Sequence, residues 1–126
     1  MNFPENLKYT KDHEWILVEG NKGTIGITDY AQGELGDVVF IDIDTTLAAI
    51  STGKSFGTIE AVKTVSDIYG PCNGKILEIN TALTSTPELI NSDPYGDGWI
   101  IKIQIENPGE IDNLLDSASY KQLIGQ

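Results

Sequence analysis

Residues 56–71 read FGTIEAVKTVSDIYGP and form two arms rich in β-branched side chains around a four-residue centre. Such side chains suit the pleated, half-buried surface of a strand, and they are poor helix formers. A helix would bring Glu60 next to Lys63, but the β-branched residues on both sides argue against this alternative. The segment therefore predicts a hairpin with its tip at residues 61–64.

Lys63 lies in this tip, and physical chemistry alone leaves two interpretations of it open. It is one of eight lysines in the chain, and most lysines are simply solvated. A lysine at a rigid, exposed tip is also what a modifying enzyme needs in order to attach a tethered group. The pattern by itself does not choose between a solvated lysine and a modified one.

The flanking sequence also favours short strands. Alternation over residues 38–44 places 39, 41 and 43 on one face, and residues 100–106 repeat the pattern with 101, 103 and 105 on the buried side. Thirteen glycines and five prolines divide the chain into short segments, which is typical of a β-sandwich or barrel. Further strands are predicted at residues 15–19 and 24–27, joined as a hairpin at Gly20-Asn21, and at residues 75–79.

Helices are expected in three places only. Thr28 can cap a short helix that Gly33 and Gly36 stop, because its hydroxyl can accept from a free amide of the first turn. Asn107 followed by Pro108 is a cap with a proline at the first helical position. A last turn or two begins at Asp116 or Ser117, so that residues 108–124 form a C-terminal helical segment. No linker interrupts the chain, and residues 1–126 are predicted to be a single domain.

The charge and composition exclude several classes of function. Nineteen acidic residues against eight basic ones give a net charge of −11, and no arginine is present. Such a chain repels phosphate backbones and anionic lipids, so neither nucleic acid nor a membrane is an expected partner. One cysteine and one histidine leave no disulfide and no ordinary zinc site. The first residues lack the features of a signal or transit peptide, and a cytoplasmic protein is expected.

Four features imitate functional sites, and each is given a structural interpretation. Residues 48–55 end like a phosphate-binding loop but lack its first glycine, and the strand-like residues after them are not the required helix. An ordinary solvent loop is expected there instead. Residues 93–98 hold two carboxylates, yet their proline and glycines favour a tight turn over a calcium loop. His13 is interpreted as a structural residue beside Trp15, and Cys72 as a small core or loop residue. Neither a catalytic residue nor a metal site is predicted.

At the Lys63 hairpin the chain resembles the H-protein of the glycine cleavage system, a lipoyl carrier. The attachment motif of that family fits Glu60, Lys63, Asp67, Ile68, Tyr69 and Pro71. Small residues near the lysine depart from the family's usual choices, namely Ala61, Thr64 and the pair Cys72-Asn73. The likeness spans nearly the whole chain and includes residues 7–10, 13–15, 26–32, 35–39, 87–91, 93–96 and 98–99.

The resemblance implies a fold and a set of site residues. The fold would be mainly β, a flattened barrel or sandwich of two small sheets (the barrel-sandwich hybrid of lipoyl domains) with a short internal helix and one or two C-terminal helices. Lys63 would carry lipoate in amide linkage, and Glu60 and Asp67 would complete the lipoylation motif. Glu14 and Asp67 resemble the acidic residues near a cleft that receives the loaded arm.

The resemblance also implies partners. A monomeric carrier would take the aminomethyl group of glycine from a pyridoxal phosphate-dependent glycine decarboxylase to an aminomethyltransferase that uses tetrahydrofolate. It would then present dihydrolipoamide to an FAD-dependent dihydrolipoyl dehydrogenase. A lipoyl ligase or a lipoyl/octanoyl transferase would attach the lipoate. The carrier itself would catalyse none of these steps.

Two other interpretations remain open beside this one. The same resemblance fits a lipoyl relay that donates lipoate to other lipoyl domains. A different class of function is a β scaffold module that is never lipoylated. Biotin carriers and the lipoyl domains of 2-oxo acid dehydrogenases fit less well, because Val62 and Thr64 flank Lys63 where those families have methionines or a preceding aspartate.

Overall fold

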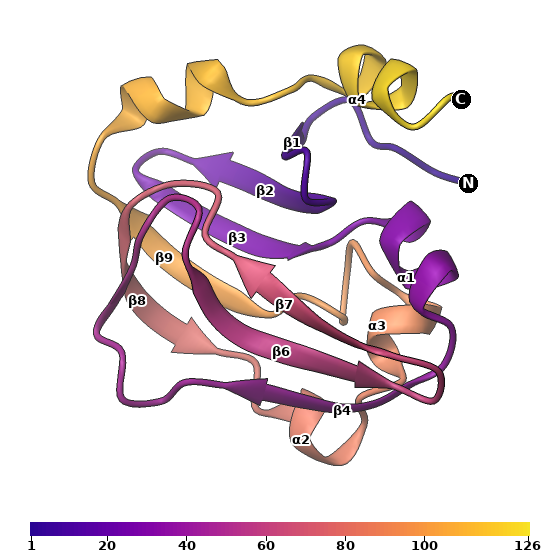
Figure 1. Ribbon diagram of the computed structural model, residues 1–126. Helices are drawn as coiled ribbons and strands as arrows, with labels where there is room; N and C mark the ends of the chain where they lie inside the picture. Colours follow the sequence, from indigo (N-terminus) through magenta and orange to yellow (C-terminus); the bar gives the residue numbers. More distant parts are fainter.

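The computed structural model describes residues 1–126 as two antiparallel sheets that enclose a shared core (Figure 1). The arrangement is sandwich-like and not a closed barrel, and few helices are present. The three-stranded sheet has the order β4-β6-β7, formed by Val38–Ile43, Ser55–Ala61 and Val65–Tyr69. The six-stranded sheet has the order β1-β2-β3-β9-β8-β5, formed by Lys8–Tyr9, Glu14–Glu19, Lys22–Ile27, Ile101–Ile105, Gly74–Ile79 and Ala49–Ile50.

The main core lies between the two sheets and is dominated by isoleucine. Sixteen buried residues form it, among them Ile25 and Ile103 from the large sheet and Ile59 and Ile68 from the small one. Branched side chains of this kind pack well on a pleated surface, which explains why an isoleucine-rich chain folds as a sandwich. Gly57 permits a close approach of β6 to β4, because a Cβ there would lie 2.6 Å from the backbone oxygen of Asp42.

Both predicted hairpins are confirmed. β2 pairs with β3 around Gly20 and Asn21, and Gly20 has the positive φ of 65° that such a tight turn favours. β6 pairs with β7, and the chain reverses at residues 62–64. The predicted burial of 101, 103 and 105 in β9 is also confirmed, since all three isoleucines are buried.

In β4 the predicted alternation is wrong at one residue. Val39 is 50% exposed, whereas Val38 is buried and Ile41 and Ile43 pack against the core. A register shift between Val38 and Phe40, where β4 pairs with β6, is the cause. This irregularity turns both Val39 and Phe40 outward, as a β-bulge does when it adds one residue to a strand.

The predicted helices form, with changes at their ends. Helix α1 (Asp29–Leu35) begins as expected, with the hydroxyl of Thr28 accepting from Ala31 N at 3.1 Å. It continues through Gly33 and ends at Gly36, where φ is 78°. The C-terminal segment divides into a 3₁₀ helix, Pro108–Asn113, and helix α4 (Ser117–Leu123), which Asp116 caps through Ser119 N.

Two short helices contradict the expectation that helices occur in three places only. They are α2 (Ala82–Ser85) and α3 (Leu89–Ser92), and each buries one aliphatic residue, Leu83 and Ile90 respectively. Neither has a side-chain hydrogen bond at its cap. One turn is too short to show helical periodicity in a sequence, and tertiary burial holds these turns in place.

The features that imitate sites are mostly structural, as predicted. Residues 93–98 form a turn in which Gly98 N donates to Asp93 O at 2.9 Å, and Cys72 is fully buried. Strand β6 and not a helix follows residues 48–55, so no phosphate-binding loop is formed. The expectation of a solvent loop there is wrong in part, because Ala49–Ile50 pairs with β8 and Ile50 is buried. No helix in the structure has the length and apolar character needed to cross a membrane.

Candidate functional site

The tip that carries Lys63 is short and anchored. Ala61 N donates to Thr64 O at 2.8 Å and closes the hairpin, and Val62 N donates to Asp37 O at 3.0 Å in the loop between α1 and β4. The β6–β7 turn lies at the same end of the molecule as α1 (Figure 1). Lys63 is exposed at this turn. The geometry therefore presents the lysine amine to solvent from a backbone held at both sides.

Apolar side chains surround the tip. Val39, Phe40, Val62 and Val65 are four of the seven large hydrophobic residues that the chain exposes. Phe40 and Val65 are both paired with Glu60 across the small sheet, so these three residues lie in one row on its outer face. This apolar surface around a charged lysine is the kind of patch that marks contact with other proteins.

The predicted motif residues Glu60 and Asp67 lie on the two strands that lead to and from the tip. Glu60 is exposed near the end of β6, and Asp67 is exposed in β7, where it is paired with Thr58. Ser55 Oγ donates to Asp67 Oδ1 at 3.3 Å. Two carboxylates are thus displayed on the hairpin, one on each arm, with Lys63 between them along the chain.

A cleft of about 300 Å³ lies beside the hairpin, and both predicted cleft residues, Glu14 and Asp67, line it. Four of its lining residues are acidic and none is a lysine. Neither Lys63 nor Glu60 is part of its wall. The full lining comprises Asp12, His13, Glu14, Ile27, Tyr30, Ala31, Glu34, Leu35, Ile59, Ser66 and Asp67.

Glu14 is the buried acid of this cleft. Only 1% of its surface is exposed, and its two carboxylate oxygens accept from Thr10 Oγ1 at 2.8 Å and Tyr69 N at 3.0 Å. Burial raises the pKa of Glu14 to about 7, although the two hydrogen bonds act in the opposite direction. Its charge consequently changes near neutral pH, and an added positive charge in the cleft would favour the ionised form.

The sequence prediction missed the part that α1 has in this cleft. Tyr30, Ala31, Glu34 and Leu35 come from α1, and no local pattern indicated that this helix would face the hairpin. His13 was interpreted as structural, yet it lines the cleft as well. One signal in the structure marks it, because His13 is the only non-glycine residue with a positive φ, 68°.

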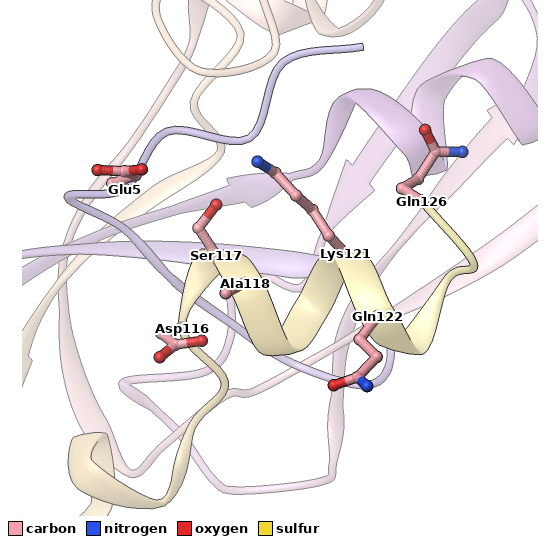
Figure 2. Close-up of a pocket in the computed structure, with 7 residues that line it drawn as sticks. All are labelled: Glu5, Asp116, Ser117, Ala118, Lys121, Gln122 and Gln126. Atoms are coloured by element: carbon pink, nitrogen blue, oxygen red, sulfur yellow. The ribbon is translucent and has the colours of Figure 1, made fainter.

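A larger hollow of about 440 Å³ lies at the C-terminal helix and offers no comparable chemistry. Figure 2 shows that its polar side chains point in different directions and do not converge on one place. None of the predicted site residues is among those that line it, which are Glu5, Asp116, Ser117, Ala118, Lys121, Gln122 and Gln126. The Lys63 hairpin and the acidic cleft, which together hold all the predicted site residues, form the candidate functional site.

Comparison with known proteins finds relatives of one family. The family model described as glycine cleavage H-protein matches residues 7–126. A glycine cleavage system H protein of Symbiobacterium thermophilum is 56% identical over 119 residues, which cover 94% of this chain and 93% of the relative. One from Bacteroides fragilis is 53% identical and covers 98% of both. The crystal structure of a glycine cleavage system H protein from Mycobacterium marinum has a TM-score of 0.89 and 37% identity, and the match covers 98% of this chain and 100% of that one.

Proposed function

Because this chain belongs to the glycine cleavage H-protein family, we propose that Lys63 is its point of lipoate attachment, through an amide bond to the side-chain nitrogen. Its function is the family function, that of a lipoyl carrier in glycine cleavage. The observation that carries the assignment is the exposed lysine at a short, anchored turn between two exposed carboxylates. When attached, lipoate supplies a long arm ending in a dithiolane that can take up and release the aminomethyl group.

The hairpin suits this attachment in two ways. An exposed amine is accessible to an attaching enzyme, and Lys63 is exposed at the turn. The closed turn holds the attachment point in one place, so that a bound arm searches a limited volume. Tethering of this kind raises the effective concentration of the carried group at each partner to the order of mM for a short flexible link.

Glu60 and Asp67 are proposed as the residues by which the attaching enzyme, a lipoyl ligase or a lipoyl/octanoyl transferase, recognises Lys63. Both are exposed, and they flank Lys63 on opposite arms of one rigid hairpin. A basic site on the enzyme can bind two carboxylates at a fixed spacing, and an isolated surface lysine does not offer such a pair. The remaining seven lysines are thereby distinguished from Lys63.

Intact mass spectrometry tests the attachment directly. Incubated with lipoate, ATP and a lipoyl ligase, the chain should gain a single lipoyl increment, and the proteolytic peptide that contains Lys63 should carry it. Absence of any increment would overturn the proposal and favour a scaffold that is never lipoylated. Loading of the lipoylated chain by glycine and the decarboxylase then separates a carrier in glycine cleavage from a relay of lipoate.

The partners proposed are the pyridoxal phosphate-dependent decarboxylase, the tetrahydrofolate-dependent aminomethyltransferase and the FAD-dependent dihydrolipoyl dehydrogenase. The chain is a carrier subunit of the glycine cleavage system, and we propose that it catalyses none of their reactions itself. The apolar residues around the tip support transient binding of each partner enzyme, because each must cover this end of the small sheet to reach the arm. The net charge of −11 would steer the carrier toward basic surfaces on them.

The acidic cleft is proposed to receive the loaded arm and to hold its protonated amine. Its volume of about 300 Å³ lies at the lower end of the range for small-molecule sites, and Glu14 and Asp67 both line it. A carboxylate accepting from an ammonium group makes a charge-assisted hydrogen bond, which is stronger than a neutral one. Enclosure beside these acids would slow the loss of the amine to water.

Replacing both acids should therefore shorten the life of the loaded form. With Glu14→Ala and Asp67→Ala combined, we expect the aminomethyl-loaded protein to decay about tenfold faster, as loss of one charge-assisted hydrogen bond of about 1.5 kcal/mol would predict. The decay is followed by the release of ammonia after removal of the decarboxylase. Glu78→Ala with Asp112→Ala is the matched control, because both residues are exposed, neither lines the cleft and the same two side-chain types, one Glu and one Asp, are removed. Equal lifetimes for the two double variants would remove the cleft from the proposal.

A further inference from the structure

His13 is held in an unusual position at the wall of the cleft. Its backbone adopts a positive φ of 68°, which costs energy in a residue with a side chain. Two backbone hydrogen bonds maintain it, from His13 N to Thr10 O at 3.1 Å and from Thr28 N to His13 O at 3.0 Å. The ring lies against Tyr30 of α1, with 5.1 Å between the ring centroids. The fold thus maintains a strained residue where it lines the proposed arm site.

The imidazole is joined to the interior by a chain of hydrogen bonds. His13 Nδ1 lies 2.9 Å from the hydroxyl oxygen of Tyr120 in α4, and that oxygen lies 2.8 Å from Thr28 Oγ1. Thr28 Oγ1 also accepts from Ala31 N at 3.1 Å, the bond that caps α1. Thr28 and Tyr120 have no exposed surface, and every buried side-chain polar atom in the structure has a partner.

The direction of these hydrogen bonds follows from the requirement that every buried hydroxyl hydrogen has an acceptor. The hydroxyl hydrogen of Thr28 has one acceptor within reach, the oxygen of Tyr120, because the only other neighbour of Oγ1 is a donor. Tyr120 then donates its own hydrogen to His13 Nδ1. In the reverse direction the hydrogen of Thr28 would be buried without an acceptor, which is costly. Nδ1 therefore accepts, and the ring proton is on Nε2.

We propose that Tyr120 is a positioning residue of the cleft, whose hydroxyl fixes His13 as a neutral imidazole with its proton on Nε2. The proposal builds on the assignment of the cleft as the site of the loaded arm. Nε2 has no partner in the chain, and it remains as a hydrogen-bond donor of a residue in the cleft wall. The wall then contributes a donor at this point without adding a positive charge.

The neutral state of His13 matters because the acidic groups around it favour the positively charged imidazolium. Asp12 on the same segment and Glu34 on α1 both raise the pKa of His13, and Glu14 and Asp67 face the same cleft. Burial outweighs these acids and lowers the pKa of His13 below its usual value. The bond from Tyr120 acts in the same direction, since it stabilises the neutral form. An imidazolium here would repel the cationic amine that the cleft is proposed to hold.

Nitrogen-detected NMR of the unmodified protein tests the assignment. His13 is the only histidine in the chain, so its ring resonances need no further assignment. We expect a single tautomer at pH 7, with hydrogen on Nε2 and an acceptor-type Nδ1. Tyr120→Phe should mix the two tautomers and raise the pKa of His13, whereas Thr28→Ser, which keeps the hydroxyl, should leave both unchanged. Hydrogen on Nδ1 in the wild type, or an unaltered spectrum in Tyr120→Phe, would overturn the proposal.

A matched variant separates this effect from a general loss of packing. Tyr9→Phe also removes one hydroxyl from a buried tyrosine, but that hydroxyl donates to Pro4 O at 2.6 Å and is outside the chain of bonds to His13. Tyr9 and Tyr120 stack with centroids 4.8 Å apart, and phenylalanine preserves the stack in either case. A change in the His13 tautomer in both variants would reduce Tyr120 to a packing residue and overturn the proposal.

The effect on the carrier is measured on the lipoylated and loaded protein. Tyr120→Phe should shorten the lifetime of the loaded form several-fold at pH 6, where His13 can now be protonated, and much less at pH 8. The same loss at both pH values would contradict a charge effect. If the wild type takes up no lipoate at all, the function assigned to the cleft is wrong. The tautomer of His13 is measured on the unmodified protein, so that test does not depend on lipoylation.

Discussion

Lys63→Arg is expected to abolish lipoylation and to reduce glycine cleavage by the reconstituted system to the background rate. Amide formation needs a nucleophilic, deprotonated amine, and the guanidinium of arginine remains protonated at any pH that proteins tolerate. The substitution keeps the positive charge and much of the length of the side chain. Because Lys63 is exposed and the bond from Ala61 N to Thr64 O closes the turn without it, we expect the fold and its stability to remain unchanged.

The control for this variant is Lys54→Arg, another exposed lysine that lies in the loop before β6. It should be lipoylated and should support glycine cleavage at the wild-type rate. Turnover is measured as the release of labelled carbon dioxide from glycine with all partner enzymes present. Retention of turnover by Lys63→Arg would show that the carrier function lies elsewhere in the chain, even if the wild type gains a lipoyl increment in the mass measurement.

The second large effect is expected in stability as a function of pH, and it comes from Glu14. Burial raises the pKa of Glu14 in the folded protein from 4.5 to about 7. Below pH 4.5 the acid is protonated in both the folded and unfolded states, and its preference for the folded protein is fully present. As pH rises toward 7 the unfolded state releases the proton first, and this contribution to stability is lost. The loss amounts to about 3 kcal/mol for a shift of this size.

Glu14→Gln isolates this contribution, because glutamine has the same shape and does not ionise. The difference in unfolding free energy between the variant and the wild type should move in favour of the variant by up to about 3 kcal/mol between pH 4.5 and 8. Urea unfolding at several pH values measures it. Glu34→Gln serves as the control, since Glu34 lines the same cleft but is exposed. A constant difference for Glu14→Gln across the range would mean that Glu14 ionises normally in the folded protein.

Local sequence determined the hairpin that carries Lys63, and the physical reason is short-range. β-Branched side chains on both arms favour extended backbone over helix, and the two arms pair with their nearest neighbour in sequence. The caps of α1 and α4 were predictable for the same reason, because Thr28 and Asp116 each bond an amide three residues away. The spaced motif around Lys63 is equally local, and its residue types alone indicate the family.

Tertiary structure alone decided the outward turn of Val39, the two short helices α2 and α3, and the composition of the cleft. Glu14 and Asp67 were suggested by resemblance, but the cleft exists because β2, α1 and the β6–β7 hairpin converge. Glu14 lines the cleft and accepts a hydrogen bond from Tyr69 N, 55 residues away in the chain. His13 and Tyr120 are 107 residues apart. Such contacts depend on burial and on sheet topology, which are properties of the whole fold, whereas turns, caps and strand preference depend on neighbouring residues that the sequence displays directly.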